Sequence, residues 1–324
     1  MGTAAEAEYA GDRTIRLMSF NVDLTRKGPG LLPRDIMRGK DKQVAGVVSR
    51  ISKLKPDILA MQSVDYDYDN VTATLLKEAL RDAGHQMSHH LALAPNTGIS
   101  TDFDLDRNGY LGDARDMQGY GKFTGQGGLL LLSRFPIFQE EVQDFTALIW
   151  KDLPGAKLPE RYFTANEEAV LRLHSVGAWD VPVQISDHTL HILMSHAGPP
   201  VFDGPEDRNG LRNADEIRFW TQYIQSMNVP FALMAGLNND PVDGEGLKPA
   251  LHNLLASPKL NDPRPVHSAG TDTVNWDFDD LRVDYVLPSS DLKVIASGVD
   301  WPIGEGEGDG IPRHKPVWVD IHWD

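Results

Sequence analysis

One stretch of the sequence restricts the fold more than any other, because an apolar run ends abruptly in a polar cluster. Residues 231–236, Phe-Ala-Leu-Met-Ala-Gly, have the length and composition of a buried strand. Asn238, Asn239 and Asp240 follow almost directly, before Pro241. Polar side chains at the carboxyl end of a buried strand lie where α/β sheets usually place their sites. The sequence therefore predicts a functional site just after residue 236.

The other apolar patterns predict strands and helices along the whole chain. Strands are predicted at 14–21, 57–62, 87–93, 127–133, 137–145, 169–174, 179–185, 189–196, 281–287, 292–296 and 317–323, and helices at 35–55, 72–83, 211–227 and 246–256. Helices mixed with many adjacent strands favour an α+β class over a regular βαβ array. No repeat or Ser- and Gly-rich linker divides the chain, so we expect one domain over 14–324 after a flexible tail at 1–13.

Composition narrows the classes of function. The 31 Lys and Arg against 47 Asp and Glu give a net charge of 31 − 47 = −16, which opposes binding to nucleic acid or to an anionic membrane. The absence of cysteine excludes disulfides and cysteine-bound metals. No apolar run approaches the roughly 20 residues of a transmembrane helix. We expect a globular monomer, and the small residues at 3–10, which resemble the stretch around a secretory cleavage site, predict a secreted or periplasmic location.

A separate motif at 104–113 has the spacing of a calcium-binding loop. Oxygen ligands at alternate positions converge on Ca²⁺ when a glycine, here Gly109, permits a sharp turn. The predicted ligands are Asp104, Asp106, Asn108 and Asp113. Arg115 stands where the closing Glu is expected, so Asp113 or Asp116 would complete the site. Bound Ca²⁺ would hold a loop insertion near 96–120 in shape, and an acidic turn is the alternative.

Six segments carry polar residues at the ends of predicted strands. They are 15–21 (Ile-Arg-Leu-Met-Ser-Phe-Asn), 56–62 (Pro-Asp-Ile-Leu-Ala-Met-Gln), the Gly-rich 127–136, 194–196 (Met-Ser-His), 282–286 (Arg-Val-Asp-Tyr-Val) and 313–317 (Arg-His-Lys-Pro-Val). In this order they resemble the motifs of the deoxyribonuclease-like endonuclease/exonuclease/phosphatase family, over nearly the whole chain. The resemblance implies a four-layer α/β/β/α sandwich, in which two mixed β-sheets pack face to face with helices outside.

The resemblance also implies metal-assisted hydrolysis of a phosphoester. A divalent ion, Mg²⁺ or Mn²⁺, would neutralise phosphate oxygens while a His and Asp pair positions or deprotonates the attacking water. The matching catalytic candidates are His196, Asn238, Asp284 and His314, with Asn21 as a substrate contact. A carboxylate between apolar neighbours needs a partner, so we expect Asp284 to pair with His196 or His314.

Three acids that the family pattern expects are missing from this chain. Ser63 follows Gln62 in place of a Glu, Gly236 replaces the water-orienting Asp, and Arg313 replaces the Asp before His314. Loss of the Glu removes the hard anionic ligand that Mg²⁺ prefers. Loss of the acid before His314 would remove the group that orients its imidazole, and Arg313 would lower its basicity.

Asp65 and Asp240 are the candidate replacements as metal ligands. On an extended segment residues 63 and 65 point to the same side, so Asp65 would reach a metal from one step further along. Asp240 lies two residues after Asn238 and would act similarly. The alternative for Asp65 is a solvated acidic loop that it shares with Asp67 and Asp69.

The loop at 202–213 concentrates guanidinium groups after His196. Arg208 and Arg212, together with Arg313, would form an anion pocket, because guanidinium suits phosphate or carboxylate. A salt-bridged loop is the alternative. No aromatic series interleaves with basic residues, so single-stranded nucleic acid is not indicated.

Two hypotheses of function follow. The first is a phosphoesterase acting on a phosphomonoester or phosphodiester, and a small or lipid-type substrate is favoured over a polynucleotide because the charge is −16. The second is a catalytically inactive family member that binds Ca²⁺ at 104–113 and an anionic ligand at the old site. For the single residues, the alternatives to a site are that Asn21 and Asn238 cap turns and that His196 and His314 are structural.

Overall fold

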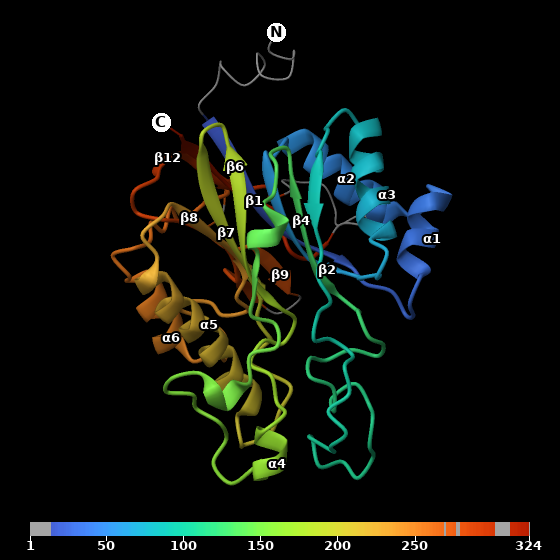
Figure 1. Ribbon diagram of the computed structural model, residues 1–324, viewed down its shortest axis with the longest axis vertical. Coiled ribbons are helices and arrows are strands. Elements are labelled where there is room, and N and C mark those ends of the chain that lie inside the picture. Colours follow the sequence, from blue (N-terminus) through green and yellow to red (C-terminus); the bar gives the residue numbers. More distant parts are fainter. Residues whose placement is uncertain (1–13, 269, 277–278, 302–311, 324) are drawn as a thin grey trace.

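Two β-sheets that pack face to face form the centre of the molecule, with helices on the outer faces (Figure 1). A computed structural model describes residues 14–268, 270–276, 279–301 and 312–323. The arrangement confirms the predicted four-layer sandwich of two mixed sheets. The expected tail at 1–13 lies outside the described residues.

The first sheet has six strands that mix parallel and antiparallel pairs. In spatial order they are β12 (Lys293–Val299), β13 (Val317–His322), β1 (Thr14–Leu24), β2 (Ile58–Val64), β4 (Gly128–Ser133) and β3 (His89–Leu91). β1 and β2 are parallel, whereas β13 is antiparallel to β1 and β4 is antiparallel to β2. The carboxyl ends of β1 and β2 therefore lie beside the amino ends of β13 and β4.

The second sheet has five strands and repeats this arrangement. In spatial order they are β11 (Asp284–Pro288), β8 (Phe231–Gly236), β7 (His188–His196), β6 (Ala178–Ile185) and β5 (Gln143–Asp144). β7 and β8 are parallel, and β11 is antiparallel to β8. A hairpin of β9 (Val274–Trp276) and β10 (Asp279–Leu281) precedes β11. The carboxyl ends of β7 and β8 therefore meet the amino end of β11.

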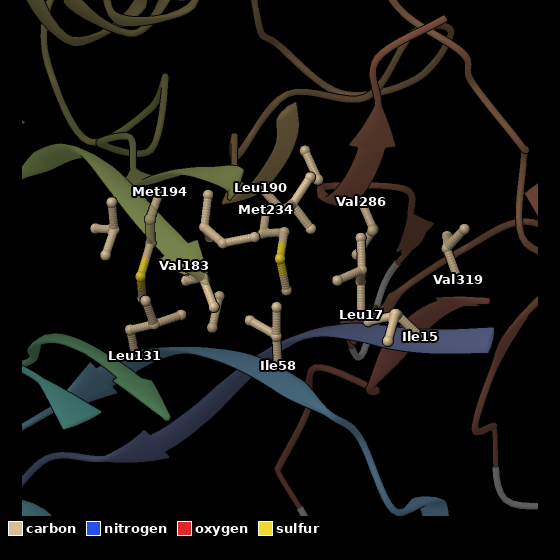
Figure 2. Close-up of a cluster of buried hydrophobic side chains, with 14 of the residues drawn as sticks. Ile15, Leu17, Ile58, Leu131, Val183, Leu190, Met194, Met234, Val286 and Val319 are labelled. Carbon is tan, nitrogen blue, oxygen red and sulfur yellow. The ribbon is translucent and has the colours of Figure 1, made fainter. Parts of the chain in front are cut away.

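Apolar side chains fill the space between the two sheets. Figure 2 shows Leu17, Ile58 and Leu131 of the first sheet facing Val183 and Met234 of the second. Removing these side chains from water is the main force that holds the sheets together. The same contact fixes which strand ends of one sheet lie near those of the other.

Helices bury the outer face of each sheet. The first sheet is covered by α1 (Leu31–Arg38), α2 (Lys42–Leu54) and α3 (Val71–Asp82), and the second by α5 (Arg208–Ser226) and α6 (Lys248–Leu255). On the first sheet Val47 and Leu76 join the cluster around Phe20. On the second, Trp220 joins the cluster around Leu233. A short helix, α4 (Ala165–Glu168), lies apart from both faces (Figure 1).

The segment predicted as one helix at 35–55, with a late start because of Gly39 as the alternative, forms two helices, α1 and α2, and α2 begins after Gly39. Gly39 ends α1 with a left-handed φ of 62°, which glycine adopts without steric cost. Asp41 then begins α2, where its side chain accepts a hydrogen bond from the N–H of Val44. A helix end and a new helix start therefore lie inside the segment, although apolar residues recur at helical spacing on both sides.

The predicted strand at 169–174 is also wrong, and the one at 137–145 forms only in part. Leu171 and Leu173 are buried, but they exchange backbone hydrogen bonds with Leu148 and Trp150 in a loop rather than with a strand ladder. Within 137–145 the chain forms the 3₁₀ turn η1 (Gln139–Glu141) and the two-residue β5. A second 3₁₀ turn, η2 (Trp150–Asp152), and the β9–β10 hairpin were not predicted.

Truncating Leu131 will test the contact between the sheets. Leu131 is 0% exposed, so Leu131→Ala should lower the free energy of unfolding by about 2–5 kcal/mol, through lost burial and the cavity left behind. Urea denaturation measures the change. The same substitution at Leu111, which is 67% exposed, is the control and should cost roughly 0.5 kcal/mol or less. Equal costs at the two positions would contradict the assignment of Leu131 to the core.

Candidate active site

Three residues form one row across the second sheet at the ends of its strands. The parallel pairing of β7 and β8 sets His196 opposite Gly236, and the antiparallel pairing of β8 and β11 sets Gly236 opposite Asp284. The row therefore brings together two predicted site residues, with the position of a missing acid between them.

His314 and Asp284 form a buried hydrogen-bonded pair. The His314 Nδ1 lies 2.7 Å from the Asp284 Oδ2, which also accepts a hydrogen bond of 3.0 Å from the Thr273 hydroxyl. Asp284 is 1% and His314 7% exposed. The backbone holds the histidine in place, because the Lys315 N–H donates to the Thr273 carbonyl at 2.7 Å. Of the two partners expected for Asp284, the structure has His314.

This pair corrects one expectation drawn from the missing acid at 313. Asp284 reaches the His314 ring from another strand and orients it, so the imidazole keeps an orienting carboxylate. The Arg313 guanidinium lies 5.4 Å from the centre of the Trp276 ring, over its face. Asp284 of β11 thus supplies the orienting carboxylate that position 313 lacks.

The His196 ring is held in its neutral form. Desolvation by the surrounding strands, and then the nearby charge of His314, lower the pKa of His196 to about 4, although Asp284 opposes the shift. The Asn238 amide donates to the Ala197 carbonyl at 2.7 Å, which places its Nδ2 3.4 Å from the His196 Nε2. Among the described residues the buried Nδ1 has no partner. At neutral pH the His196 ring is therefore uncharged, so it can form hydrogen bonds but does not supply a positive charge.

Residues at the ends of β1 and β2 complete the edge of the site. Asn21 is buried, and its Oδ1 accepts a weak hydrogen bond of 3.3 Å from the Asp23 N–H. Gln62 donates to the Ser19 hydroxyl at 3.1 Å, and its Oε1 has no partner within the described chain. Ser63 has a left-handed φ of 60° and lines the cavity described below. These groups offer neutral oxygens where the family pattern has a carboxylate.

Asp23 is a candidate that the sequence reasoning missed. Desolvation raises its pKa, while the nearby charges of His314, Arg26 and Arg313 act against that shift. An acid therefore lies near His314 on the first sheet. The available signal was its position two residues after Asn21, but nothing in the spacing distinguished it from a surface acid.

The predicted metal ligands Asp65 and Asp240 accept hydrogen bonds from backbone N–H groups. The two oxygens of Asp65 accept hydrogen bonds from the N–H groups of Gly127 (3.0 Å) and Arg26 (2.8 Å), and burial raises the pKa of Asp65 to about 6. In Asp240, Oδ1 accepts from Val242 and Asp243, and Oδ2 from Arg282, each at 2.7 Å. Every oxygen of both carboxylates already has a donor.

The donors at the strand ends do not fit the divalent metal that the family resemblance implied. A hard cation such as Mg²⁺ is bound through carboxylates. Apart from the paired carboxylate of Asp284 and the carboxylate of Asp23, the site offers amide and hydroxyl oxygens, and the one set of three grouped His, Asp or Glu ligands in the described chain lies elsewhere. No chemical step is therefore assigned to a metal at this site.

That set lies in the predicted calcium loop and consists of Asp104, Asp106 and Asp116. One oxygen from each lies within 4.8 Å of the others. Asp113 instead accepts hydrogen bonds from the Asn108 side chain (2.7 Å) and the Arg115 N–H (2.7 Å). Of the two closing acids considered for this loop, the structure places Asp116 in the cluster and directs Asp113 to the loop backbone.

Two of the three predicted anion-binding arginines, Arg208 and Arg212, line the cavity described below, and both are hydrogen-bonded to the protein. Arg212 is buried and donates to backbone carbonyls, including those of Leu173 and Gln118. Arg208 donates to the Leu105 carbonyl at 2.6 Å and lies 3.7 Å from Glu206. Both arginines tie loops together, which matches the alternative of an internally bonded loop.

A cavity of about 620 Å³ opens beside the row of site residues. Ser63, His196 and Asn238 form part of its wall, and Leu105, Trp150 and Phe163 form another part. Its volume falls in the range of roughly 300–1,000 Å³ that is typical of small-molecule sites. The site is therefore continuous with a space large enough for a ligand.

Proton uptake by His196 will test the assignment of its neutral state. Because its pKa is about 4 in the fold against an ordinary 6.5, its contribution to stability is complete above pH 6.5 and is lost as the pH falls through 4. NMR of the imidazole nitrogens should show a neutral ring down to about pH 4. His196→Gln should remove this part of the pH dependence of unfolding. A ring that titrates near 6.5 would contradict the assignment.

No helix in the described residues is long and apolar enough to cross a membrane.

Solved structures with the same fold confirm the architecture. An endonuclease/exonuclease/phosphatase from Beutenbergia cavernae is 17% identical, with 96% of this chain and 72% of that chain covered and a TM-score of 0.60. A family protein from Leptotrichia buccalis is 17% identical, with 95% and 100% covered and a TM-score of 0.57. Sphingomyelinase C from Streptomyces griseocarneus is 15% identical, with 95% and 99% covered and a TM-score of 0.52. At these identities the likeness shows the fold alone.

Sequence comparison identifies the family. No curated protein matches this chain. Residues 18–306 nevertheless match the profile of the Endonuclease/Exonuclease/phosphatase family, which is most of the chain. The chain therefore belongs to the endonuclease/exonuclease/phosphatase family.

Proposed function

We propose that this protein hydrolyses a phosphoester, and that the substrate is a small or lipid-type phosphate rather than a polynucleotide. The observation that carries the proposal is the buried His314–Asp284 pair beside the neutral His196, at the strand ends of a fold whose family includes nucleases and phosphatases. The net charge of −16 favours a substrate smaller than a polyanion. One structure with the same fold is a sphingomyelinase.

In this mechanism the His314–Asp284 pair activates water. Asp284 accepts a hydrogen bond from the Nδ1–H of His314, which leaves Nε2 to take a proton from the attacking water. The water oxygen forms a bond to phosphorus and the ester P–O bond breaks. The leaving oxygen takes up a proton from solvent, and the imidazolium then releases its Nε2 proton to solvent. Asp284 stabilises the imidazolium, and the Thr273 hydroxyl keeps the carboxylate oriented. The neutral His196 and Asn238 contact the phosphoryl group.

Replacing either member of the pair will test this role. His314→Gln and Asp284→Asn should each lower turnover by roughly 10²–10⁴-fold, the usual contribution of a general base. The assay uses p-nitrophenyl phosphate and bis(p-nitrophenyl) phosphate with Mg²⁺, Mn²⁺, Ca²⁺ or a chelator, so it also measures any metal dependence. His188→Gln, on the exposed start of β7, is the matched control and should leave turnover unchanged. Turnover that persists in both site variants would refute the proposal.

A catalytically inactive binding protein is the second candidate. It is favoured by Ser63, Gly236 and Arg313, which stand where the family pattern has acids. Absence of turnover under every metal condition would select it.

Gly236→Asp tests whether the missing acid limits turnover. A Cβ at this position would lie 3.1 Å from the His196 Cδ2 and 3.4 Å from the Asp284 Oδ1, so the new carboxylate would enter the row after a small shift of the ring. If the scaffold is otherwise competent, turnover should rise. Unchanged turnover in a folded variant would indicate that Gly236 is not what limits activity.

We also propose that the loop at 104–116 binds Ca²⁺ and is stabilised by it. The grouping of Asp104, Asp106 and Asp116 supports this proposal, because Ca²⁺ prefers several carboxylate oxygens. The site would stiffen the insertion that forms one wall of the cavity, without taking part in chemistry.

Thermal unfolding with added Ca²⁺ will test the loop. At Ca²⁺ concentrations of roughly 100 times Kd, binding should stabilise the fold by about 2.7 kcal/mol and raise Tm. Asp106→Asn should abolish the increase, whereas Asp69→Asn, an exposed acid outside the cluster, should keep it. An equal increase in both variants would place Ca²⁺ elsewhere.

A further inference from the structure

We propose that the cavity beside His196 is a subsite for the hydrocarbon part of an amphiphilic phosphoester. The inference rests on the proposed function, because it assigns the phosphoryl group to the strand ends and the apolar substituent to the cavity. It extends that function by naming the substrate class and the residues that select it.

The wall of the cavity is largely apolar and comes from parts of the chain far apart in sequence. Its apolar lining includes Leu105, Met117, Trp150, Phe163, Leu171 and Val176. Leu105 and Met117 belong to the insertion, while the others come from the segment between β5 and β6. A partly open apolar surface of this kind favours a hydrocarbon occupant, because each apolar group that leaves water contributes to binding.

The cations in the wall are engaged with other protein groups. Arg208 and Arg212 donate to backbone carbonyls, as described above, and Arg115 lies 3.5 Å from the Asp106 carboxylate. Burial lowers the pKa of Arg212. The carboxylates of Asp106 and Glu206 offset part of the positive charge of Arg115 and Arg208. The apolar side chains named above form the surface that a hydrocarbon would contact.

The cavity reaches the catalytic row at His196. His196, Asn238 and Ser63 all contribute to its wall. A phosphoryl group held by these residues would direct its ester substituent past Ala197 and Gly198, which also line the cavity. One molecule would thus occupy the strand ends and the apolar space together.

α5 holds the wall of the cavity in place before a ligand binds. Its Glu216 accepts hydrogen bonds from the N–H groups of Ser175 (2.6 Å) and Gly198 (2.8 Å), so one carboxylate joins two segments of the wall. Arg212, one turn earlier, joins the same helix to the carbonyls of Gln118 and Leu173. A wall that is already ordered costs little conformational entropy when a ligand binds.

Two aromatic residues that line the cavity are also exposed. Tyr120 is 64% and Phe202 77% exposed. Exposed aromatic rings at the edge of an apolar space provide the first contacts for a hydrocarbon chain that enters from water. They are consistent with a single amphiphile entering through this edge.

Binding of alkylphosphonates will test the subsite without relying on turnover. Their P–C bond is not an ester, so the protein cannot hydrolyse them, and calorimetry with butyl-, octyl- and dodecylphosphonate below their micellar concentrations gives Kd for each. In the wild type, affinity should rise with chain length by roughly three- to fourfold per methylene until the cavity is filled. Inorganic phosphate measures the contribution of the headgroup alone.

Met117→Trp fills the cavity and should abolish the gain with chain length. Met37→Trp is the matched control, because Met37 is 65% exposed on α1 and does not line the cavity. Met117→Ala enlarges the space and should keep the gain, which guards against a misfolded Trp variant; thermal unfolding checks all three. A wild-type affinity independent of chain length, or a gain that survives in folded Met117→Trp, would overturn the subsite.

Different results would refute the subsite and the enzymatic function. If alkylphosphonates bind with the expected dependence but no phosphoester is hydrolysed, the subsite stands and the enzymatic proposal fails. If p-nitrophenyl esters are hydrolysed but chain length has no effect on phosphonate binding, the activity stands and the subsite fails.

Discussion

The apolar contact between the two sheets is the constraint on which the rest of the structure depends. Each sheet contains one central parallel pair, β1 with β2 and β7 with β8, and antiparallel neighbours begin where those strands end. The sheets pack face to face through residues such as Leu131 and Met234 (Figure 2), and Ser63 of β2 and His196 of β7 line one cavity at their strand ends. Neither sheet alone could assemble the site, because Asn21 and Gln62 lie on one and His196 and Asp284 on the other.

The second organising element is α5, which connects the fold to the walls of the site. Asn213 donates to the carbonyls of Gly198 and Leu237, each at 2.8 Å, and accepts from Asn239. Its neighbour Glu216 is buried, and burial raises its pKa to about 7 while the Arg212 charge opposes the shift. Burying Asn213 and Glu216 costs desolvation free energy, and their hydrogen bonds to several backbone segments offset that cost.

The site shows how a fold can lose acids and keep an ordered geometry. Gly236 lies between His196 and Asp284 and leaves room that a carboxylate would occupy. Removing that acid also removes a negative charge next to Asp284, and with it a repulsion that would otherwise need a counter-ion. The histidine–aspartate pair therefore persists without the acid that the family pattern expects at position 236.

Sequence alone determined the class of fold, the strand 231–236 and the candidates His196, Asp284 and His314, because apolar period and motif order are properties of the chain. It did not determine which histidine pairs with Asp284, the break at Gly39, or the fate of Asp65 and Asp240. The sequence does not show which groups contact a carboxylate. In the fold, backbone N–H groups from distant segments donate hydrogen bonds to the oxygens of Asp65 and Asp240. Only the tertiary structure decided these points and formed the cavity, since both depend on contacts between residues far apart in the chain.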